Sequence, residues 1–143
     1  MTSINPRLLN LNRSRYRDID LSFKRNPLNN DLQTLSTTES IKQSVRNLVL
    51  TAFYEKWFRP DIGNFAASSI FELFIDEHVD AIQNSIYNML LRYEPRITFK
   101  NNKRDIEVTE DVADGNELRV KINYLIVGSN DQDNIQIRVQ RLK

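Results

Sequence analysis

Leu91-Arg92-Tyr93-Glu94-Pro95-Arg96-Ile97-Thr98-Phe99 is the stretch that decides the fold, because two kinds of hydrophobic pattern meet at its centre. Apolar residues before it repeat at the period of an α-helix, and those after it alternate as in a β-strand. Proline lacks a backbone N–H and disfavours helical geometry in the residue before it. The sequence therefore predicts a rigid corner at Pro95, with the opposite charges of Glu94 and Arg96 on its two sides.

The residues before the corner predict helices. Ser36-Thr37-Thr38-Glu39 has the form of a capping box, in which the Ser and Glu side chains each satisfy a free backbone donor. Apolar residues follow at helical spacing as far as Phe53, so we expect this helix to end near residues 54–57. A long helix is predicted over residues 76–93, and a short one over residues 68–74.

The residues after the corner predict strands. Apolar pairs in 97–99 and 106–108 flank the polar turn 101–104, which is typical of a β-hairpin. Residues 118–126 and 135–139 then alternate between apolar and polar side chains. Helices followed by a run of strands favour an α+β fold. We expect the helices to pack on one face of an antiparallel sheet of about four strands.

The start of the chain predicts an arm followed by one domain. Residues 1–15 are polar and read as an N-terminal arm, and residues 16–143 as a single α+β domain. Ile19, Leu21 and Phe23 alternate with polar residues, which predicts a short strand or an extended segment laid on the core.

Composition excludes most catalytic chemistry. The net charge is +1, and the chain contains no cysteine, three glycines and one histidine, His78. A zinc thiolate site, a cysteine nucleophile, a glycine-rich phosphate loop and a histidine-dependent triad therefore lack their residues. We expect no enzyme activity, no cofactor and no metal. No secretory signal is visible at the N-terminus and no apolar run reaches membrane-spanning length, so no membrane partner is expected.

Two other classes of function stay open. A peptidoglycan hydrolase with two catalytic carboxylates needs neither glycine nor histidine. The 19 acidic residues make a close carboxylate pair expected by chance, so this class is only weakly favoured. A small nucleic-acid-binding protein is favoured less, because acidic residues interrupt the arginines near the N-terminus. The hydrolase carboxylates would come from Glu72, Asp76, Glu77, Asp80 and Glu94.

Two stretches indicate interaction surfaces. Of the aromatic residues that close the first predicted helix, Phe53 fits core packing best. Trp57 fits an exposed interface anchor better, since aromatic residues and arginine dominate binding hot spots. The last predicted strand, residues 134–141, ends the sequence. A terminal strand often lies at a sheet edge, where its unpaired backbone groups can accept a strand from another chain. Its cations either protect that edge from aggregation or select the partner.

Three stretches together resemble a known family. They are Asp18-Ile19-Asp20-Leu21-Ser22-Phe23, Phe58-Arg59-Pro60-Asp61-Ile62-Gly63 and Tyr93-Glu94-Pro95-Arg96. In this order and at these distances they resemble the baseplate wedge protein of contractile-tailed phages, a family that includes the matching baseplate component of type VI secretion systems. The resemblance covers about residues 16–140. The N-terminal arm and the acidic loop 109–117 do not match the family's pattern.

The resemblance implies a structural protein of the virion tail baseplate, assembled in the host cytoplasm and present in several copies. Its partners would be other wedge proteins and the sheath subunit, close to the tail tube, with no nucleic acid. The family's sheet resembles the interlocking domain of the sheath subunit, which implies that the chain initiates sheath polymerisation by sharing strands. The Glu-Pro-Arg turn is expected to contact the helical core bundle of the wedge. Some relatives carry a lysozyme label.

These considerations give two sets of candidate residues. The wedge-contact candidates are Glu94, Pro95, Arg96, Arg59, Asp61 and Trp57. The candidates for sharing a strand with the sheath are Ile135, Ile137, Arg138, Val139 and Arg141.

Overall fold

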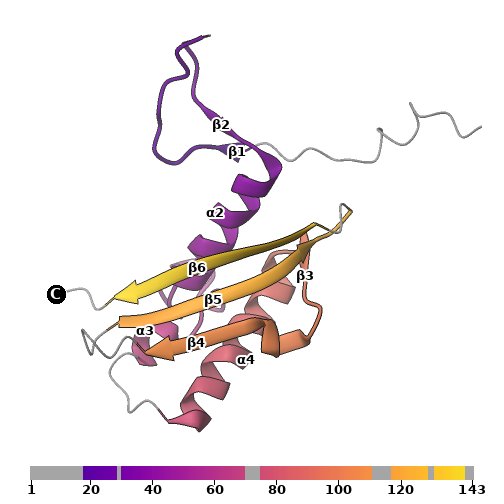
Figure 1. The fold of residues 1–143 in the computed structure, drawn as a ribbon. Helices are drawn as coiled ribbons and strands as arrows, with labels where there is room; N and C mark the ends of the chain where they lie inside the picture. The colour runs from indigo at the N-terminus through magenta and orange to yellow at the C-terminus, as the bar shows by residue number, and fades with distance from the viewer. Residues whose placement is uncertain (1–17, 29, 70–74, 111–116, 129–130, 141–143) are drawn as a thin grey trace, which may run out of the picture. The chain divides into compact units, whose positions relative to one another are not determined.

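The computed structural model has an α+β fold, in which helices precede a four-stranded antiparallel sheet as the sequence predicts (Figure 1). It divides into two compact units, Met1–Gln43 and Ser44–Lys143, and the boundary falls inside helix α2. The predicted arm, residues 1–15, lies outside the described part, and a single domain over residues 16–143 stays a prediction. The described residues are 18–28, 30–69, 75–110, 117–128 and 131–140.

In the first unit, β1 (Asp18–Ile19) pairs with β2 (Thr34–Leu35) in antiparallel orientation. The short strand predicted here is observed as β1, whereas the alternative of an extended segment laid on the core is wrong within this unit, because Ile19, Leu21 and Phe23 are 47%, 57% and 67% exposed. The cause is local. The carboxylate of Asp20 accepts the N–H of Ser22 at 2.9 Å, and Phe23 adopts a φ of 51°. The chain therefore turns before the alternation can continue as a strand.

Helix α2 (Thr37–Leu50) begins at the predicted capping box. The backbone N–H of Ser36 donates to the carboxylate of Glu39 at 2.9 Å, and the N–H of Glu39 donates to Oγ of Ser36 at 3.4 Å. These reciprocal bonds satisfy donors that a helix start leaves without partners.

The end of α2 is set by Asn64, a residue that no sequence pattern singles out. Its buried side-chain amide lies within hydrogen-bonding distance of three carbonyl oxygens at the helix end, including that of Val49 at 2.8 Å. The last carbonyls of a helix need such partners. The helix therefore ends at Leu50, and its predicted extension to residues 54–57 is wrong.

Helix α4 (Asp76–Tyr93) has the predicted bounds. Ile82, Ile86, Met89 and Leu90 are buried along one stripe. The N–H of Glu94 closes the last turn on the carbonyl of Leu90 at 2.9 Å, and Pro95 then ends the helix as expected. Of the short helix predicted over residues 68–74, residues 68 and 69 belong to α3 (Ala66–Ser69), and residues 70–74 lie outside the described part.

Strand β5 (Glu117–Ile126) is central in the sheet. Strand β6 (Gln132–Gln140) pairs along one side of it, and β3 (Ile97–Thr98) and β4 (Ile106–Glu110) pair one after the other along its other side. The predicted hairpin between the segments that form β3 and β4 is therefore wrong.

The short helix η1 (Asn102–Asp105) explains this difference. The carboxylate of Asp105 accepts the backbone N–H groups of Lys100 and Asn101, each at 2.8 Å. Because these bonds close a helical turn and not a reversal, the chain leaves η1 in its original direction. Strand β4 then continues along the edge of β5 that β3 began.

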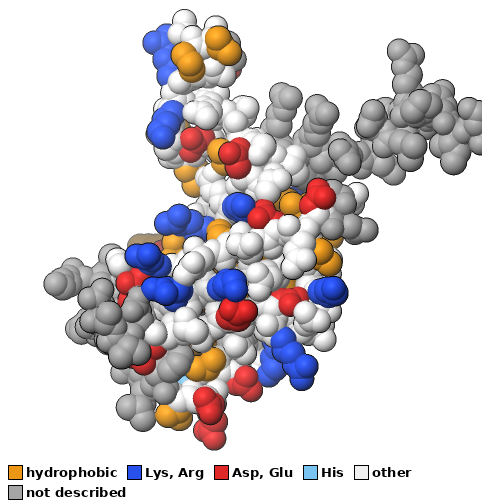
Figure 2. All heavy atoms as spheres, viewed as in Figure 1, with side chains coloured by type: hydrophobic (Ala, Val, Ile, Leu, Met, Phe, Trp, Pro, Cys, Tyr) orange, Lys and Arg blue, Asp and Glu red, His pale blue; other side chains and the backbone are white. Residues whose placement is uncertain are grey.

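Burial alternates along the strands, so the sheet has one covered face and one open face. Helices α3 and α4 lie behind the strands in Figure 1, with α4 against β4 and α3 against β6. The open face carries charged side chains (Figure 2), such as Glu107 and Lys121, which form an ion pair of 3.2 Å across β4 and β5. Within the described residues, no helix is long and apolar enough to cross a membrane.

Candidate functional site

The two charges of the proline corner bind each other. The carboxylate of Glu94 accepts Nε of Arg96 at 2.5 Å and Nη2 at 2.8 Å, which makes a bidentate ion pair around Pro95. Glu94 is 2% exposed, and the Arg96 side chain is 20% exposed. Burial raises the pKa of the Glu94 carboxyl. The hydrogen bonds from Arg96 and Ser44 and the charge of Arg96 together lower this pKa by more than burial raises it. The net pKa lies below its ordinary value, so Glu94 stays ionised and braces the corner from within.

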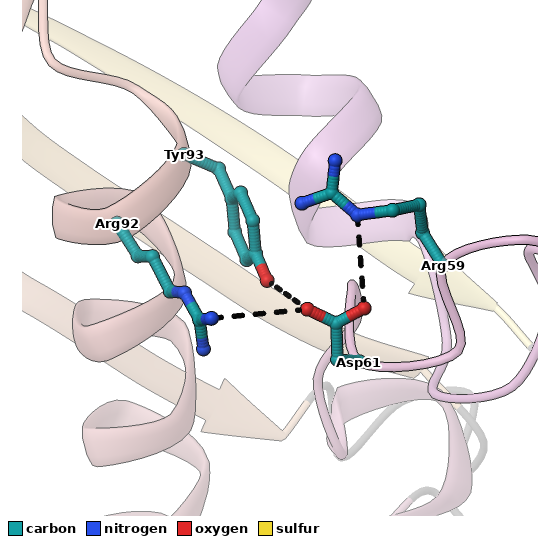
Figure 3. Close-up of polar contacts among 4 residues, drawn as sticks. All are labelled: Arg59, Asp61, Arg92 and Tyr93. Carbon is teal, nitrogen blue, oxygen red and sulfur yellow. Dashed lines mark hydrogen bonds and ion pairs between the residues drawn. The ribbon is translucent and has the colours of Figure 1, made fainter.

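A second polar cluster lies between the loop after α2 and the end of α4 (Figure 3). Its centre is Asp61, whose carboxylate accepts a hydrogen bond of 2.7 Å from the hydroxyl of Tyr93. Arg59 approaches the same carboxylate at 3.8 Å and Arg92 at 4.0 Å. The hydrogen bond from Tyr93 and then the two guanidinium charges lower the pKa of Asp61. We call Arg59, Asp61, Arg92 and Tyr93 the Asp61 cluster.

The ring of Tyr93 organises this cluster. The guanidinium carbons of Arg59 and Arg92 lie 5.8 Å and 5.4 Å from the centroid of the ring, within the range of cation–π attraction. Asp61 and the ring therefore contact both arginines, although both arginine side chains are more than half exposed.

Gly63 fixes the loop that carries Asp61. A Cβ at this position would lie 2.5 Å from the backbone carbon of Ala52 and from the nitrogen of Phe53. Only glycine allows so close an approach between the loop and the segment that follows α2. A parallel bridge between Ala52 and Asn64 continues the contact.

An open groove of about 380 Å³ adjoins the Asp61 cluster. Phe53, Phe65 and Met89 supply apolar lining, and the two phenylalanine rings lie 4.7 Å apart. Along α4 the lining residues recur at helical spacing. They are Ala81, Ser85, Asn88, Met89, Arg92 and Tyr93.

The loop 54–58 exposes large aromatic side chains. Tyr54, Trp57 and Phe58 are 84%, 94% and 96% exposed. Trp57 thus lies on the surface, where an interface anchor must lie. Tyr54 has a φ of 66°, and its N–H donates to the carbonyl of Pro60 at 3.2 Å, so the loop holds an uncommon backbone conformation.

Strand β6 pairs with β5 and with no other strand in the described part of the sheet. The N–H of Ile126 donates to the carbonyl of Asp131 at 3.0 Å. This bond determines which residues of β5 and β6 are hydrogen-bonded to the opposite strand. Because antiparallel ladders alternate, Ile135, Ile137 and Val139 direct their backbone groups to β5. The even-numbered residues of β6 direct theirs to the free side.

The side chains of β6 follow the same alternation. Ile137 and Val139 are buried, Ile135 is partly buried, and Arg138 is exposed and approaches Glu117 of the same sheet at 3.6 Å. Arg141 lies outside the described residues.

The structure brings the wedge-contact candidates together in pairs, Glu94 with Arg96 and Arg59 with Asp61. Sequence reasoning missed Arg92 and Tyr93, although they directly precede the corner on α4. The described residues contain no group of three or more His, Cys, Asp or Glu that could hold a metal ion.

Known proteins share this fold. A tail-lysozyme candidate from Geobacter sulfurreducens has a TM-score of 0.64 at 24% identity, covering 76% of this chain and 95% of its own. A chain in the anti-feeding prophage baseplate has a TM-score of 0.57 at 20% identity, covering 90% and 88%. Baseplate wedge protein gp25 of Enterobacteria phage T4 is 29% identical over 125 residues, which cover 87% of this chain and 89% of the phage protein.

Fold and relatives together define a structural component of a contractile-tail baseplate, one that assembles with other baseplate proteins. The family model described as Baseplate wedge protein gp25 matches residues 35–131, which is more than half of the chain. The chain therefore belongs to this baseplate wedge family, and the resemblance seen in the sequence is confirmed.

Proposed function

We propose that this chain docks on the core of the baseplate wedge and initiates polymerisation of the sheath by sharing a strand at the free edge of β6. The observation that carries the proposal is the one-sided pairing of β6 described above. A strand in this position offers a row of backbone donors and acceptors to an incoming strand.

The docking half of the proposal rests on the corner and on the loop 54–61. The ion pair between Glu94 and Arg96 fixes the corner, so docking costs little conformational entropy. Pro95 is exposed, and Arg96 keeps part of its side chain at the surface. Trp57 adds a large exposed apolar surface of the kind that forms hot spots.

The lysozyme alternative gains no support from Glu94 or Asp80. A glycosidase acid needs a raised pKa and access to the substrate. Glu94 has a lowered pKa and is buried, and Asp80 forms an exposed ion pair with Lys103 at 3.3 Å. Glu72 lies outside the described residues.

The test uses the chain co-expressed with the wedge and sheath proteins of its own system. Gln136→Pro removes one backbone donor on the free side of β6 and leaves the ladder to β5 intact. We expect the variant to co-purify with the wedge but to start fewer sheaths in electron micrographs than Gln136→Ala. Equal sheath counts for the two variants would refute strand sharing at this edge. Failure of the wild-type chain to co-purify with the wedge would refute the docking half.

A further inference from the structure

We infer that the groove between the loop 53–65 and helix α4 binds a segment of another wedge protein, one that places an acidic side chain against Arg59 and Arg92. An apolar side chain of the same segment would enter the groove beside Phe53 and Phe65. The inference rests on the proposed function, because it specifies the chemistry of the wedge partner.

Charge is the first argument for an acidic partner. In the Asp61 cluster two guanidinium groups share one carboxylate, and that carboxylate also accepts the hydroxyl of Tyr93. Each guanidinium carries five N–H donors, so the two arginines together offer more donors than one carboxylate can accept. The side chains of Arg59 and Arg92 are 60% and 70% exposed. A second carboxylate, supplied by a partner, would complete the cluster.

The second argument is that the cluster is organised before binding. The guanidinium carbons of Arg59 and Arg92 both lie within 6 Å of the Tyr93 ring centroid. Each guanidinium approaches a different oxygen of the Asp61 carboxylate (Figure 3). Arginine side chains lose rotamer freedom when they bind, and this loss weakens affinity. Because contacts inside the chain already restrict Arg59 and Arg92, less of that freedom is left to lose.

The third argument is the apolar wall of the groove. Phe53 and Phe65 form a tilted ring pair, and Phe65 is 53% exposed. Ala81 and Ser85 of α4 have small side chains, which let a partner backbone approach the helix closely. The volume of about 380 Å³ lies in the range of sites that enclose ligand groups.

The position of the groove favours a wedge protein over the sheath subunit. Its lining comes from the loop and from α4, and no residue of strand β6 contributes to it. Tyr93 lines the groove and is followed at once by the Glu94-Pro95-Arg96 corner, so the groove continues the surface proposed to dock on the wedge.

A photo-crosslinking experiment tests the occupant. The photoreactive residue p-benzoylphenylalanine replaces Ser85, which is partly exposed on the groove floor, and the chain is co-expressed and purified with its wedge proteins. We expect irradiation to join it to one wedge peptide that contains Asp or Glu, as identified by mass spectrometry. The same residue at Lys121, on the open face of the sheet, should not crosslink to that peptide. An adduct with a second copy of this chain or with the sheath subunit would overturn the inference.

Charge reversal tests the recognition. Arg59→Glu combined with Arg92→Glu should lower the recovery of the wedge partner at least tenfold. Changing the crosslinked acidic residue of the partner to Lys should restore it. Arg46→Glu, at an exposed position of α2, is the matched control and should bind like the wild type. If the double variant also binds like the wild type, the inference fails while wedge docking stands. If the wild-type chain itself does not bind the wedge, the proposed function fails first.

Discussion

Glu94 and Arg96 form a bidentate ion pair across Pro95, at 2.5 Å and 2.8 Å, with the carboxylate buried. The corner that separates helices from strands is thus held by the two charges that flank it. The structure shows that these charges brace the corner from within, and a contact of Arg96 with a partner stays a prediction.

Glu94→Gln should destabilise the fold in a pH-dependent way. At neutral pH we expect a loss of about 3 kcal/mol, because the partly buried charge of Arg96 loses its ion pair with Glu94. The folded-state pKa of Glu94 lies below its ordinary value of 4.5. Its contribution to stability is therefore present above that pH and is lost as the pH falls through the folded pKa.

Urea unfolding from about pH 7 down to about pH 3 measures this effect. The difference between the wild type and Glu94→Gln should narrow below pH 4.5. Glu107→Gln, whose exposed ion pair with Lys121 contributes little, is the control and should change stability by less than about 1 kcal/mol. A difference that stays constant over the whole pH range would contradict the assignment.

Asn64→Ala should destabilise the second unit by about 2 kcal/mol, because buried carbonyls at the end of α2 lose their donor. Hydrogen exchange should rise first at Ala66, whose N–H donates to Oδ1 of Asn64 at 2.8 Å. Asn88→Ala, at an exposed position of α4, should cost less than about 0.5 kcal/mol. Equal effects of the two substitutions would show that Asn64 does not cap the helix.

The parts of the fold that sequence could predict have strong local signals. The capping box at Ser36 and the proline at position 95 set the start of α2 and the end of α4, because each acts on backbone groups within one helical turn. Alternation likewise predicted the strands and their buried face.

The parts that sequence could not predict depend on contacts between distant residues. Asn64 ends α2 from a position 15 residues beyond Val49. Tyr93 reaches Asp61 across 32 residues, so the Asp61 cluster has no local pattern. Asp105 converts an apparent hairpin turn into η1 by accepting two backbone N–H groups, a choice that polar turn residues alone do not reveal.

Trp57→Ser should separate binding from stability. The side chain is 94% exposed, so the unfolding free energy should change by less than about 0.5 kcal/mol. If Trp57 is a hot spot of wedge docking, affinity for the wedge should fall by about 2 kcal/mol, or roughly thirtyfold. Leu28→Ser alters an equally exposed apolar residue in the other unit and is the matched control. Unchanged affinity on biolayer interferometry would remove Trp57 from the docking surface.

The phase of the β5–β6 ladder predicts opposite results for proline at two neighbouring positions. The N–H of Gln136 faces the free side of β6, so Gln136→Pro should leave the unfolding free energy within about 1 kcal/mol of the wild type. Ile137→Pro removes a donor to β5 and a side chain that is 3% exposed, and should cost at least about 3 kcal/mol.

Thermal unfolding and hydrogen exchange distinguish the two cases. In Gln136→Pro the amides of β5 that donate to β6, such as Ile126, should keep their slow exchange. In Ile137→Pro they should exchange fast. A reversed order of stability would contradict this ladder, because the free backbone groups of β6 would then belong to Ile135, Ile137 and Val139. Such a slip by one residue would also turn these three side chains to the open face, against the burial of Ile137 and Val139.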